Sequence, residues 1–423
     1  MKLPVEFEER MRGILGCDFG NFLSTYERSA EKGIRVNTLK ISVEDFEKIS
    51  PFTLEAIPWE KSGFYVSDEG LGKTIYHAAG LYYVQEPSAM CAAPELEAKS
   101  GERVLDLCSA PGGKGTQLAQ ELQGGGILFL NEINFSRAKI LSSNVERLGV
   151  KNAVVTCSEP KRLAGEFENY FDKILVDAPC SGEGMFKKEE AAVAEWSLDN
   201  VKLCAGRQAE ILDCAFKMLA AGGKMVYSTC TFAPEEDELQ IENFLSAHVN
   251  CKLSKMRKLY PHEIRGEGHF FAVLEKTDGE RRDKKPVAPT VKDKRMLAEY
   301  KKWESENLKV KFDNLHAVGD ALYSLPAEFP QFGVQTLRAG VKLGEFISGR
   351  FEPSHSLAMC LKKGEADGIE LGEETALKYL RGLTFDCPDK RGWNLVLYGG
   401  FTLGWCKVSG GTAKNKLPKG LRI

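Results

Sequence analysis

The sequence predicts an α/β protein whose central part is a mostly parallel sheet with helices on both faces. Three observations support this fold class. Short apolar segments alternate with amphipathic helical segments between residues 96 and 275. A glycine-rich turn joins the first of these strands to the first helix. Strand patterns with little helical periodicity dominate the C-terminal part of the chain.

The composition is typical of a globular protein, and the overall charge does not indicate a nucleic-acid partner. The chain has 423 residues, enough for two or three domains, and its net charge of −3 means that any basic surface must be local. The N-terminus lacks the apolar core of a secretory signal and no apolar run approaches about 18 residues, so we expect a cytoplasmic protein without membrane contact. The cysteines and histidines lack zinc-ligand spacing, so we expect reduced thiols and no metal.

The elements divide the chain into four parts. Residues 1–95 mix short helix and strand signals, as in "GIRVNTLKIS" and "GFYVSDEGLGK", and predict a small α+β domain. In the core, 96–275, strands are expected at 103–109, 126–133, 152–158, 171–179, 224–230 and 269–276. Helices are expected at 115–122, 136–149, 203–223 and 234–248, with a further helical stretch after 158.

The last two parts are a charged linker and a β-rich domain. Residues 276–309 are charged and poor in apolar side chains, which favours an exposed linker over the alternative of an RNA-contacting arm. Residues 310–423 contain strand-like runs, including "EFPQFGVQTL", "AMCLKKGEA" and "GWNLVLYGGFTLGWCKVSG". The final 33 residues carry six Lys or Arg, no Asp or Glu, and interleaved aromatics. This composition suits RNA contact as well as it suits core aromatics with solvated lysines.

A loop at residues 104–119, "VLDLCSAPGGKGTQLA", has the pattern of a nucleoside-binding turn. Gly112, Gly113 and Gly115 would let backbone approach a ligand closely at a helix N-terminus. The order of residues fits neither a P-loop nor the dinucleotide G-x-G-x-x-G pattern. Glu132, at the end of the next strand, is placed to bind a ribose diol. A nucleoside without a phosphate tail, such as S-adenosylmethionine, suits this combination.

Two cysteines follow the fourth and fifth predicted parallel strands. Cys180 lies in "DAPCSGEG" and Cys230 in "STCTF", so both should face the crevice at the carboxyl ends of the strands. A thiolate that adds to C6 of cytosine activates C5 for methylation, and Asp177 is placed to hold the N3/N4 edge of the base. The base must leave its stack to reach such a pocket. The residues alone leave open which thiol attacks, and a buried structural thiol is the common alternative for each.

Four linked motifs carry a resemblance to a known family. "LDLCSAPGGKGTQLA", "NEINFSR", "FDKILVDAPCSGEGMF" and "VYSTCTFAPEEDE" resemble those of the Nol1/Nop2/Sun family of RNA cytosine-C5 methyltransferases. "RFEPSHSLAM" and the C-terminal tail resemble its bacterial RsmF/YebU-type branch. The resemblance implies a Rossmann-like class I methyltransferase core, S-adenosylmethionine as cofactor and a PUA-like RNA-binding domain. The substrate it implies is 16S rRNA, free or within the small ribosomal subunit.

The resemblance also assigns roles to residues. It makes Cys230 the nucleophile, gives Cys180 a part in product release, and places Asp177 near cofactor and base. The family's aspartate after the third strand is replaced here by "TCSEPKR", where spacing selects Glu159 and Ser158 is adjacent. The predicted cofactor-binding residues are therefore Cys108, Ser109, Ala110, Pro111, Gly112, Gly113, Lys114, Glu132, Glu159 and Asp177.

Two other functions remain alternatives. The same chemistry on tRNA would use the same core, and a non-catalytic ribosome-assembly factor could keep the fold. The presence of both Cys180 and Cys230, together with Asp177 and an intact loop, argues against a factor without activity. We expect a monomer with an RNA partner.

Overall fold

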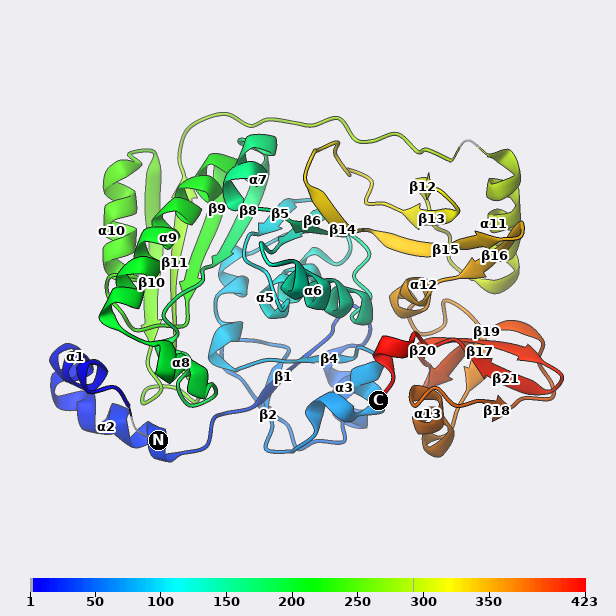
Figure 1. Ribbon diagram of the computed structural model, residues 1–423, viewed down its shortest axis with the longest axis horizontal. Helices are drawn as coiled ribbons and strands as arrows, with labels where there is room; N and C mark the ends of the chain where they lie inside the picture. The colour runs from blue at the N-terminus through cyan, green and yellow to red at the C-terminus, as the bar shows by residue number, and fades with distance from the viewer. Residues whose placement is uncertain (1–2, 292) are drawn as a thin grey trace.

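The computed structural model describes residues 3–291 and 293–423. Met1 and Lys2 of the predicted N-terminal domain, and Lys292 of the predicted linker, lie outside the described residues. A large central sheet is flanked by one small sheet from the N-terminal part and two from the C-terminal part (Figure 1). Among the described residues, no helix has both the length and the apolar character needed to cross a membrane.

The central sheet has eight strands in the order β10-β11-β9-β8-β5-β6-β7-β14. Its parallel strands are β5 (Arg103–Asp106), β6 (Ile127–Asn131), β7 (Ala153–Cys157), β8 (Phe171–Asp177) and β9 (Leu219–Thr229). The chain runs outward from β5 to β7 and then returns to place β8 on the other side of β5. The strand order therefore reverses between β5 and β8, where open α/β sheets bind their ligands.

Helices cover both faces of this sheet because its strands are apolar on both sides. Leu105 and Phe129 pack with α7 (Pro160–Glu166), α9 (Leu198–Met218) and α10 (Glu238–Ala247). Their neighbours Val104 and Leu128 point to the other face and pack with α5 (Gly113–Leu122) and α6 (Phe135–Arg147). This alternation is the signature of a doubly covered sheet. The predicted α/β class is confirmed.

Three antiparallel strands complete the sheet, and two of them differ from expectation. Strand β11 (His269–Lys276) was predicted, whereas its partner β10 (Cys251–Leu259) was not, because "CKLSKMRKL" is mostly exposed and lysine-rich. Strand β14 (Gln335–Ala339) comes from the C-terminal part of the chain and pairs with β7 at the opposite edge. We expected this run to lie in a separate β-rich domain, and its pairing with the central sheet was not predicted.

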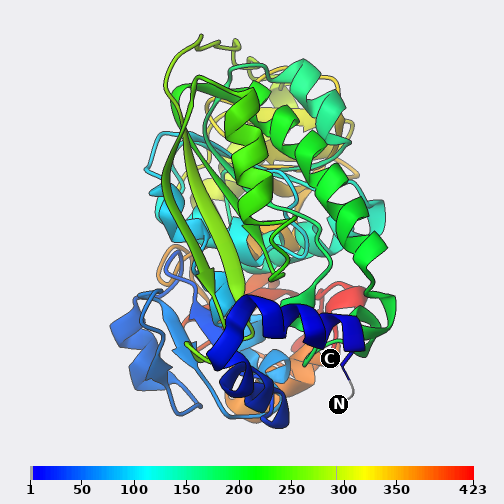
Figure 2. The same ribbon diagram turned by 90° about the vertical axis from the view of Figure 1, so that its left-hand side faces the viewer.

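The N-terminal part contributes two helices and a four-stranded sheet. Helices α1 (Val5–Leu15) and α2 (Phe19–Ser24) lie beneath the ends of β10 and β11 (Figure 2). Their Phe7 and Phe22 pack against Phe186 and Phe232, which belong to the loops after β8 and β9. The sheet contains β2 (Glu55–Ala56), β3 (Gly63–Tyr65), β1 (Gly33–Val36) and β4 (Tyr82–Val84), with α3 (Val43–Ile49) and α4 (Ile75–Ala78) beside it.

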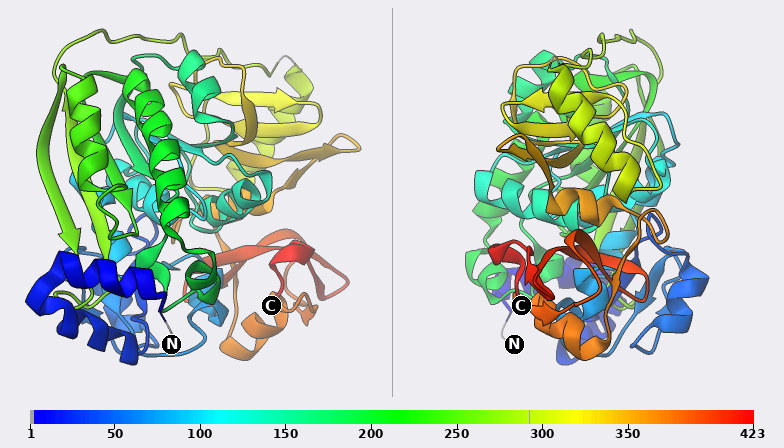
Figure 3. Two further views of the ribbon diagram at one scale, coloured as in Figure 1. Left: turned by 60° about the vertical axis from the view of Figure 1, so that its left-hand side comes forward. Right: turned by 90° about the vertical axis from the view of Figure 1, so that its right-hand side faces the viewer.

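The segment expected to be a linker contains a helix in its second half. Helix α11 (Lys294–Asn307) packs its Tyr300 and Trp303 rings against Phe351, and it crosses the neighbouring sheet (Figure 3). These spaced aromatics make one side of α11 apolar although its overall composition is charged. The strand-like pattern of "AMCLKKGEA" was also wrong, since this run forms the end of a helix and a loop.

The C-terminal part is otherwise built from two sheets. The first contains β12 (Leu315–Val318), β13 (Ala321–Ser324), β15 (Val341–Ile347) and β16 (Arg350–Pro353). The second contains β17 (Gly368–Glu370), β19 (Gly392–Tyr398), β20 (Phe401–Ser409), β21 (Thr412–Asn415) and β18 (Phe385–Asp386). Helix α12 (His355–Cys360) connects the two sheets, and α13 (Glu373–Leu380) lies between β17 and β18 of the second sheet. Helix α8 (Glu190–Glu195) is a short helix of the core. Phe401 and Trp405 of the basic tail are buried, as a core role for these aromatics requires.

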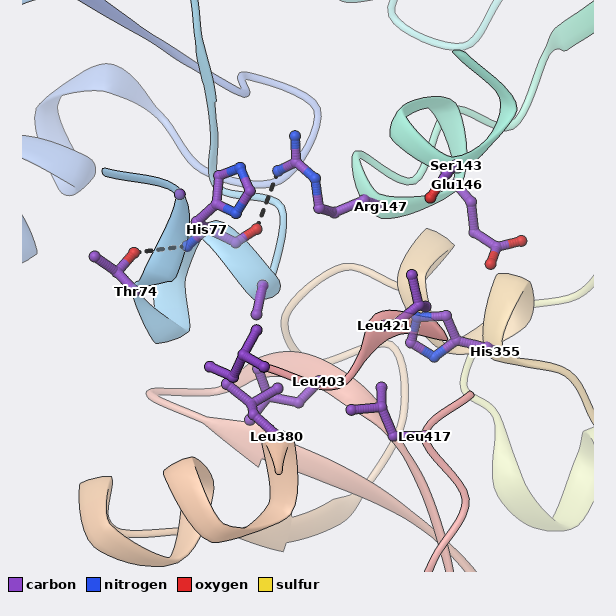
Figure 4. A pocket seen from close by; sticks show the side chains of 13 residues that line it. Thr74, His77, Ser143, Glu146, Arg147, His355, Leu380, Leu403, Leu417 and Leu421 are labelled. Atoms are coloured by element: carbon purple, nitrogen blue, oxygen red, sulfur yellow. Dashed lines mark hydrogen bonds between the residues drawn. The ribbon is translucent and has the colours of Figure 1, made fainter. Parts of the chain in front are cut away.

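A cavity of about 160 Å³ lies where the three parts of the chain meet (Figure 4). His77 of α4, Arg147 of α6 and His355 of α12 line it together with leucines from residues 380–423 of the chain, Leu380, Leu403, Leu417 and Leu421. None of the predicted site residues is among its lining residues. This cavity is therefore a junction between packed units and is separate from the predicted active site.

Candidate active site

The two predicted thiols lie in contact. Cys180 follows β8 and Cys230 follows β9, and the pairing of Asp177 with Ser228 aligns the ends of these strands. The two Sγ atoms are 3.3 Å apart although the residues are 50 positions apart in the chain. Both cysteine residues are partly exposed.

Buried polar contacts fix the two cysteine loops to each other. The Gly184 N–H donates to the Cys230 carbonyl at 2.9 Å, and the Ser181 and Thr231 hydroxyls are 2.8 Å apart. The carboxylate of Glu236, fully buried, accepts from the Ser181 N–H at 3.0 Å. A side chain at Gly184 would place its Cβ 3.0 Å from the Cys230 carbonyl oxygen, which explains the second glycine in "SGEG". The thiols are thus held by a rigid frame.

The contact between the sulfurs affects the protonation of Cys180. The hydrogen bond with Cys230, reinforced by burial, raises the pKa of Cys180 well above its ordinary value. Cys180 therefore remains protonated at neutral pH and is placed to donate its S–H to the Cys230 sulfur. This arrangement fits Cys180 as a proton donor and leaves Cys230 as the candidate nucleophile.

Asp177 and Lys114 form an ion pair at the carboxyl end of β8. Lys114 Nζ lies 2.8 Å from Asp177 Oδ2, and the Ser228 hydroxyl donates to Asp177 Oδ1 at 2.8 Å. Burial acts to raise the pKa of Asp177, but Lys114 and the hydrogen bonds outweigh it, so the pKa is lowered. Burial likewise acts to lower the pKa of Lys114, but Asp177 raises it overall. Both groups are charged at neutral pH, and the Asp177 side chain is still 33% exposed to the crevice.

The predicted cofactor loop, Cys108 to Lys114, connects β5 to α5 and is held by its neighbours. The Ala110 carbonyl accepts from Arg137 Nη2 at 2.8 Å and the Pro111 carbonyl from Asn144 Nδ2 at 2.9 Å. Gly112 has φ of 114°, which favours glycine, and no side chain of the described chain caps the N-terminus of α5 there. The N–H groups of this helix start are therefore available to a ligand.

Three residues of the loop have surroundings that limit what they can do. Ser109 is buried and its N–H donates to the Asn131 carbonyl at 2.8 Å. Burial and the carboxylate of Asp106 raise the pKa of Cys108, so this thiol is unsuited to be a nucleophile. Gly113 lies against Gln85, whose amide would be 3.3 Å from a Cβ at that position.

Two carboxylates flank the loop. Glu132, at the end of β6, is 3% exposed, and its Oε1 accepts from the Asn134 N–H at 2.9 Å. Asp106 is completely buried, and neither of its oxygens has a hydrogen-bond partner within the described part of the chain. Burial, with a smaller effect of Asp177, raises the pKa of Asp106 to about 7. Sequence reasoning did not assign Asp106, although an acid inside the apolar run "VLDL" was a signal.

The two candidate residues after the third strand, Ser158 and Glu159, lie in different surroundings. Ser158 is buried, and its carbonyl accepts from Asn131 Nδ2 at 2.9 Å. Glu159 begins α7 with an exposed side chain that makes no capping bond to the helix. Its assignment to cofactor binding remains a prediction, since its carboxylate stands outside the network of the other site residues.

Arg35 of β1 holds the cofactor loop from the N-terminal sheet. Its side chain is 1% exposed and its Nη2 donates to the Gly113 carbonyl at 3.0 Å and to Thr116 Oγ1 at 2.8 Å. Arg35 Nε donates to Gln85 Oε1 at 3.1 Å. Nothing in the strand pattern "GIRVNTLKIS" predicts this contact, because the partners lie about 80 residues later.

Replacing Arg35 with methionine should weaken cofactor binding by about tenfold, equivalent to ~1.4 kcal/mol. The methionine keeps the apolar stem but removes the donors that fix the loop. Calorimetric titration with S-adenosylmethionine would measure the change. Arg338→Met is the matched control, because Arg338 donates to the Gly340 carbonyl and the Ser356 hydroxyl and, within the described residues, makes no hydrogen bond to the loop. Equal losses in both variants would contradict a specific role for Arg35.

Comparisons with known proteins agree across the chain. Residues 93–275 match the family described as 16S rRNA methyltransferase RsmB/F, and residues 3–87 match the N-terminal domain of 16S rRNA methyltransferase RsmF. Residues 301–361 match the RsmF rRNA methyltransferase first C-terminal domain, and residues 367–423 match the methyltransferase RsmF PUA domain. The expected PUA-like character is thereby confirmed for residues 367–423, whereas residues 301–361 match a separate domain.

Individual relatives give the same result. Ribosomal RNA small subunit methyltransferase F of Shewanella oneidensis is 33% identical, over 95% of this chain and 92% of that protein. The protein of the same name from Vibrio parahaemolyticus is 32% identical, over 99% and 97%. The crystal structure of a methyltransferase homolog from Pyrococcus horikoshii is similar with a TM-score of 0.58 and 31% identity, covering 63% of this chain and 93% of that one. The chain therefore belongs to the RsmF-type family of 16S rRNA methyltransferases, within the Nol1/Nop2/Sun group that its motifs resemble.

Proposed function

We propose that this protein transfers a methyl group from S-adenosylmethionine to C5 of a cytosine in 16S ribosomal RNA. The observation that carries the proposal is the contact between Cys180 and Cys230, 3.3 Å apart, beside the Asp177–Lys114 ion pair. Family membership supports ribosomal RNA as the substrate. A methyltransferase acting on a nitrogen or a ribose oxygen would have no use for two adjacent thiols.

Two adjacent thiols meet a chemical requirement of methylation at C5 of cytosine. C5 of cytosine is a poor nucleophile until a group adds to C6. Cys230 would form the C6–S bond as a thiolate, and the ring would become electron-rich at C5. After methylation a base takes the C5 proton, the electrons of the C5–H bond form the C5–C6 double bond, and the C6–S bond breaks, which returns the Cys230 thiolate. S-adenosylmethionine supplies the electrophilic methyl group.

Asp177 would orient the base during this addition. Its carboxylate can accept from the N4 amino group and stabilise a proton at N3, which makes C6 more electrophilic. Lys114 keeps that carboxylate ionised at neutral pH, since the pair is charged and 2.8 Å apart. The exposed third of Asp177 is the part open to an incoming base.

The residues around the loop fit S-adenosylmethionine. The buried Asp106 lacks a partner for either oxygen among the described residues, which suits it to an ammonium group such as that of the methionine part. Glu132 offers a carboxylate at the end of β6 for the ribose hydroxyls. The N-terminus of α5 offers N–H groups for a carboxylate.

The test is to trap the covalent intermediate. In Cys180→Ala, which lacks the S–H beside Cys230, we expect a protein–RNA adduct that survives denaturing electrophoresis. The wild-type protein should release product, with 5-methylcytosine found in the RNA by mass spectrometry. Cys157→Ala is a matched control, because Cys157 is a partly exposed thiol at the end of β7 and away from the pair.

The choice of RNA separates the remaining alternatives. Free 16S rRNA, small ribosomal subunits and tRNA would each be offered to the wild-type protein and to Cys180→Ala. Methylation of tRNA alone would favour the tRNA alternative. RNA binding without methylation or adduct would favour the non-catalytic alternative and sink the proposed chemistry.

A further inference from the structure

His269 is a buried histidine at the active edge of the sheet to which neither the sequence motifs nor the family comparison gives a role. It begins β11 and its side chain is 2% exposed. Phe271 pairs with Ser228, and because alternate residues share a face, His269 lies on the same face as Ser228 and Asp177. Neither ring nitrogen has a hydrogen-bond partner within the described residues.

A purely structural role does not explain a buried imidazole whose two nitrogens are unpaired among the described residues. A neutral imidazole has one donor and one acceptor, and leaving both unpaired in the interior is unfavourable. An apolar ring would fill the same space without that cost. Unpaired buried polar atoms at a site are therefore a sign that a partner arrives in another state of the protein.

The carboxylate of Asp177 lies close to the His269 ring. His269 Nε2 is 4.0 Å from Asp177 Oδ1, which is beyond hydrogen-bond distance. That oxygen already accepts from the Ser228 hydroxyl, and the other accepts from Lys114, but each carboxylate oxygen can accept twice. A small movement of the Asp177 side chain would complete a third bond.

The ring is a neutral group at physiological pH. Burial and the nearby Lys114 lower the pKa of His269 to about 3, against the opposing effect of Asp177. These two charged groups, from α5 and β8, are the ones that act on the ring. A neutral donor can orient a carboxylate without removing its charge, a task that differs from that of Lys114.

We propose that His269 is a positioning residue that donates its ring N–H to Asp177 when the target base is bound. The inference rests on the proposed function, in which Asp177 holds the edge of cytosine. Hydrogen bonds in active sites are often long without substrate and tighten in the complex, which accounts for the 4.0 Å separation. The donor would fix the Asp177 carboxylate in the plane of the base.

The test compares two substitutions that separate shape from hydrogen bonding. His269→Phe keeps a ring of similar size and removes the donor, whereas His269→Asn keeps a neutral donor. For the phenylalanine variant we expect kcat to fall by about tenfold or more, with KM for RNA and the affinity for S-adenosylmethionine within about twofold of wild type. The asparagine variant should recover most of kcat. His269→Leu serves the same purpose if the phenylalanine variant does not fold.

His355 provides a matched control. It is a half-buried histidine with a lowered pKa whose Nδ1 has no partner among the described residues, but it lines the cavity at the junction of the three parts. His355→Phe should leave kcat unchanged. Wild-type kcat in His269→Phe, or an equal loss in His269→Asn, would overturn the role of His269 alone. Absence of 5-methylcytosine formation by the wild-type protein would overturn the proposed function and this inference with it.

Discussion

Cys230→Ala is expected to abolish methyl transfer to RNA, by on the order of 10³-fold or more, because no other group replaces a covalent nucleophile. Cys180 is not expected to replace it, because burial still raises the pKa of Cys180 after the partner sulfur has been removed. Cofactor binding should persist, because the loop from Cys108 to Lys114 is fixed by Arg137, Asn144 and Arg35 and not by Cys230. Transfer of labelled methyl groups and calorimetric titration would measure the two properties.

Cys204→Ala is the control for removing a cysteine near this region. Cys204 is buried in α9 and makes only a weak contact with Asn200, so its loss should leave transfer unchanged. The double variant Cys180→Ala/Cys230→Ala should form no adduct, which would tie the trapped species to Cys230. Residual transfer by Cys230→Ala at more than a few per cent would exclude Cys230 as the nucleophile.

Asp177→Ala is expected to lower the free energy of unfolding by about 3 kcal/mol, the lower end of the range for breaking a buried ion pair. The loss arises because Lys114 Nζ, 9% exposed as a side chain, would keep its charge without a partner. The lower end applies because Asp177 is one third exposed. Urea unfolding followed by circular dichroism would measure the change, and methyl transfer should be lost as well.

A second substitution distinguishes the effect of Asp177→Ala on stability from its effect on activity. Asp177→Ala/Lys114→Met removes both charges and should regain much of the stability while activity stays lost. The exposed pair of Asp45 and Lys48 serves as a control, because Asp45→Ala should change stability little. If the double variant were as unstable as the single one, the unpaired lysine would not be the cause.

Local motifs were sufficient to predict the parts of the site that follow strands directly. "DAPCSGEG" and "STCTF" placed Cys180 and Cys230 at the ends of neighbouring strands, and the structure brings their sulfurs into contact. The cofactor turn was predicted from its glycines, and Gly112 has the positive φ that such a turn requires. These features depend on a few adjacent residues and on the order of strands in a parallel sheet.

The remaining parts depend on contacts between distant segments, which a local pattern does not encode. Arg35 reaches Gly113 from a different sheet, and His269 meets Asp177 only because β11 runs antiparallel to β9. Strand β10 was not predicted because most of its side chains are exposed, so its sequence lacks the apolar alternation of a half-buried strand. Glu159 was selected by spacing alone, and spacing carries no information on which way a side chain turns.

The pairing of β14 with β7 has a consequence for how the chain acquires its structure during synthesis. The strands of the core are complete by residue 276, yet the outer edge of β7 is covered only when residues 335–339 have been made. Until then that edge presents free N–H and C=O groups to other chains. A fragment ending near residue 300 should therefore aggregate through this edge.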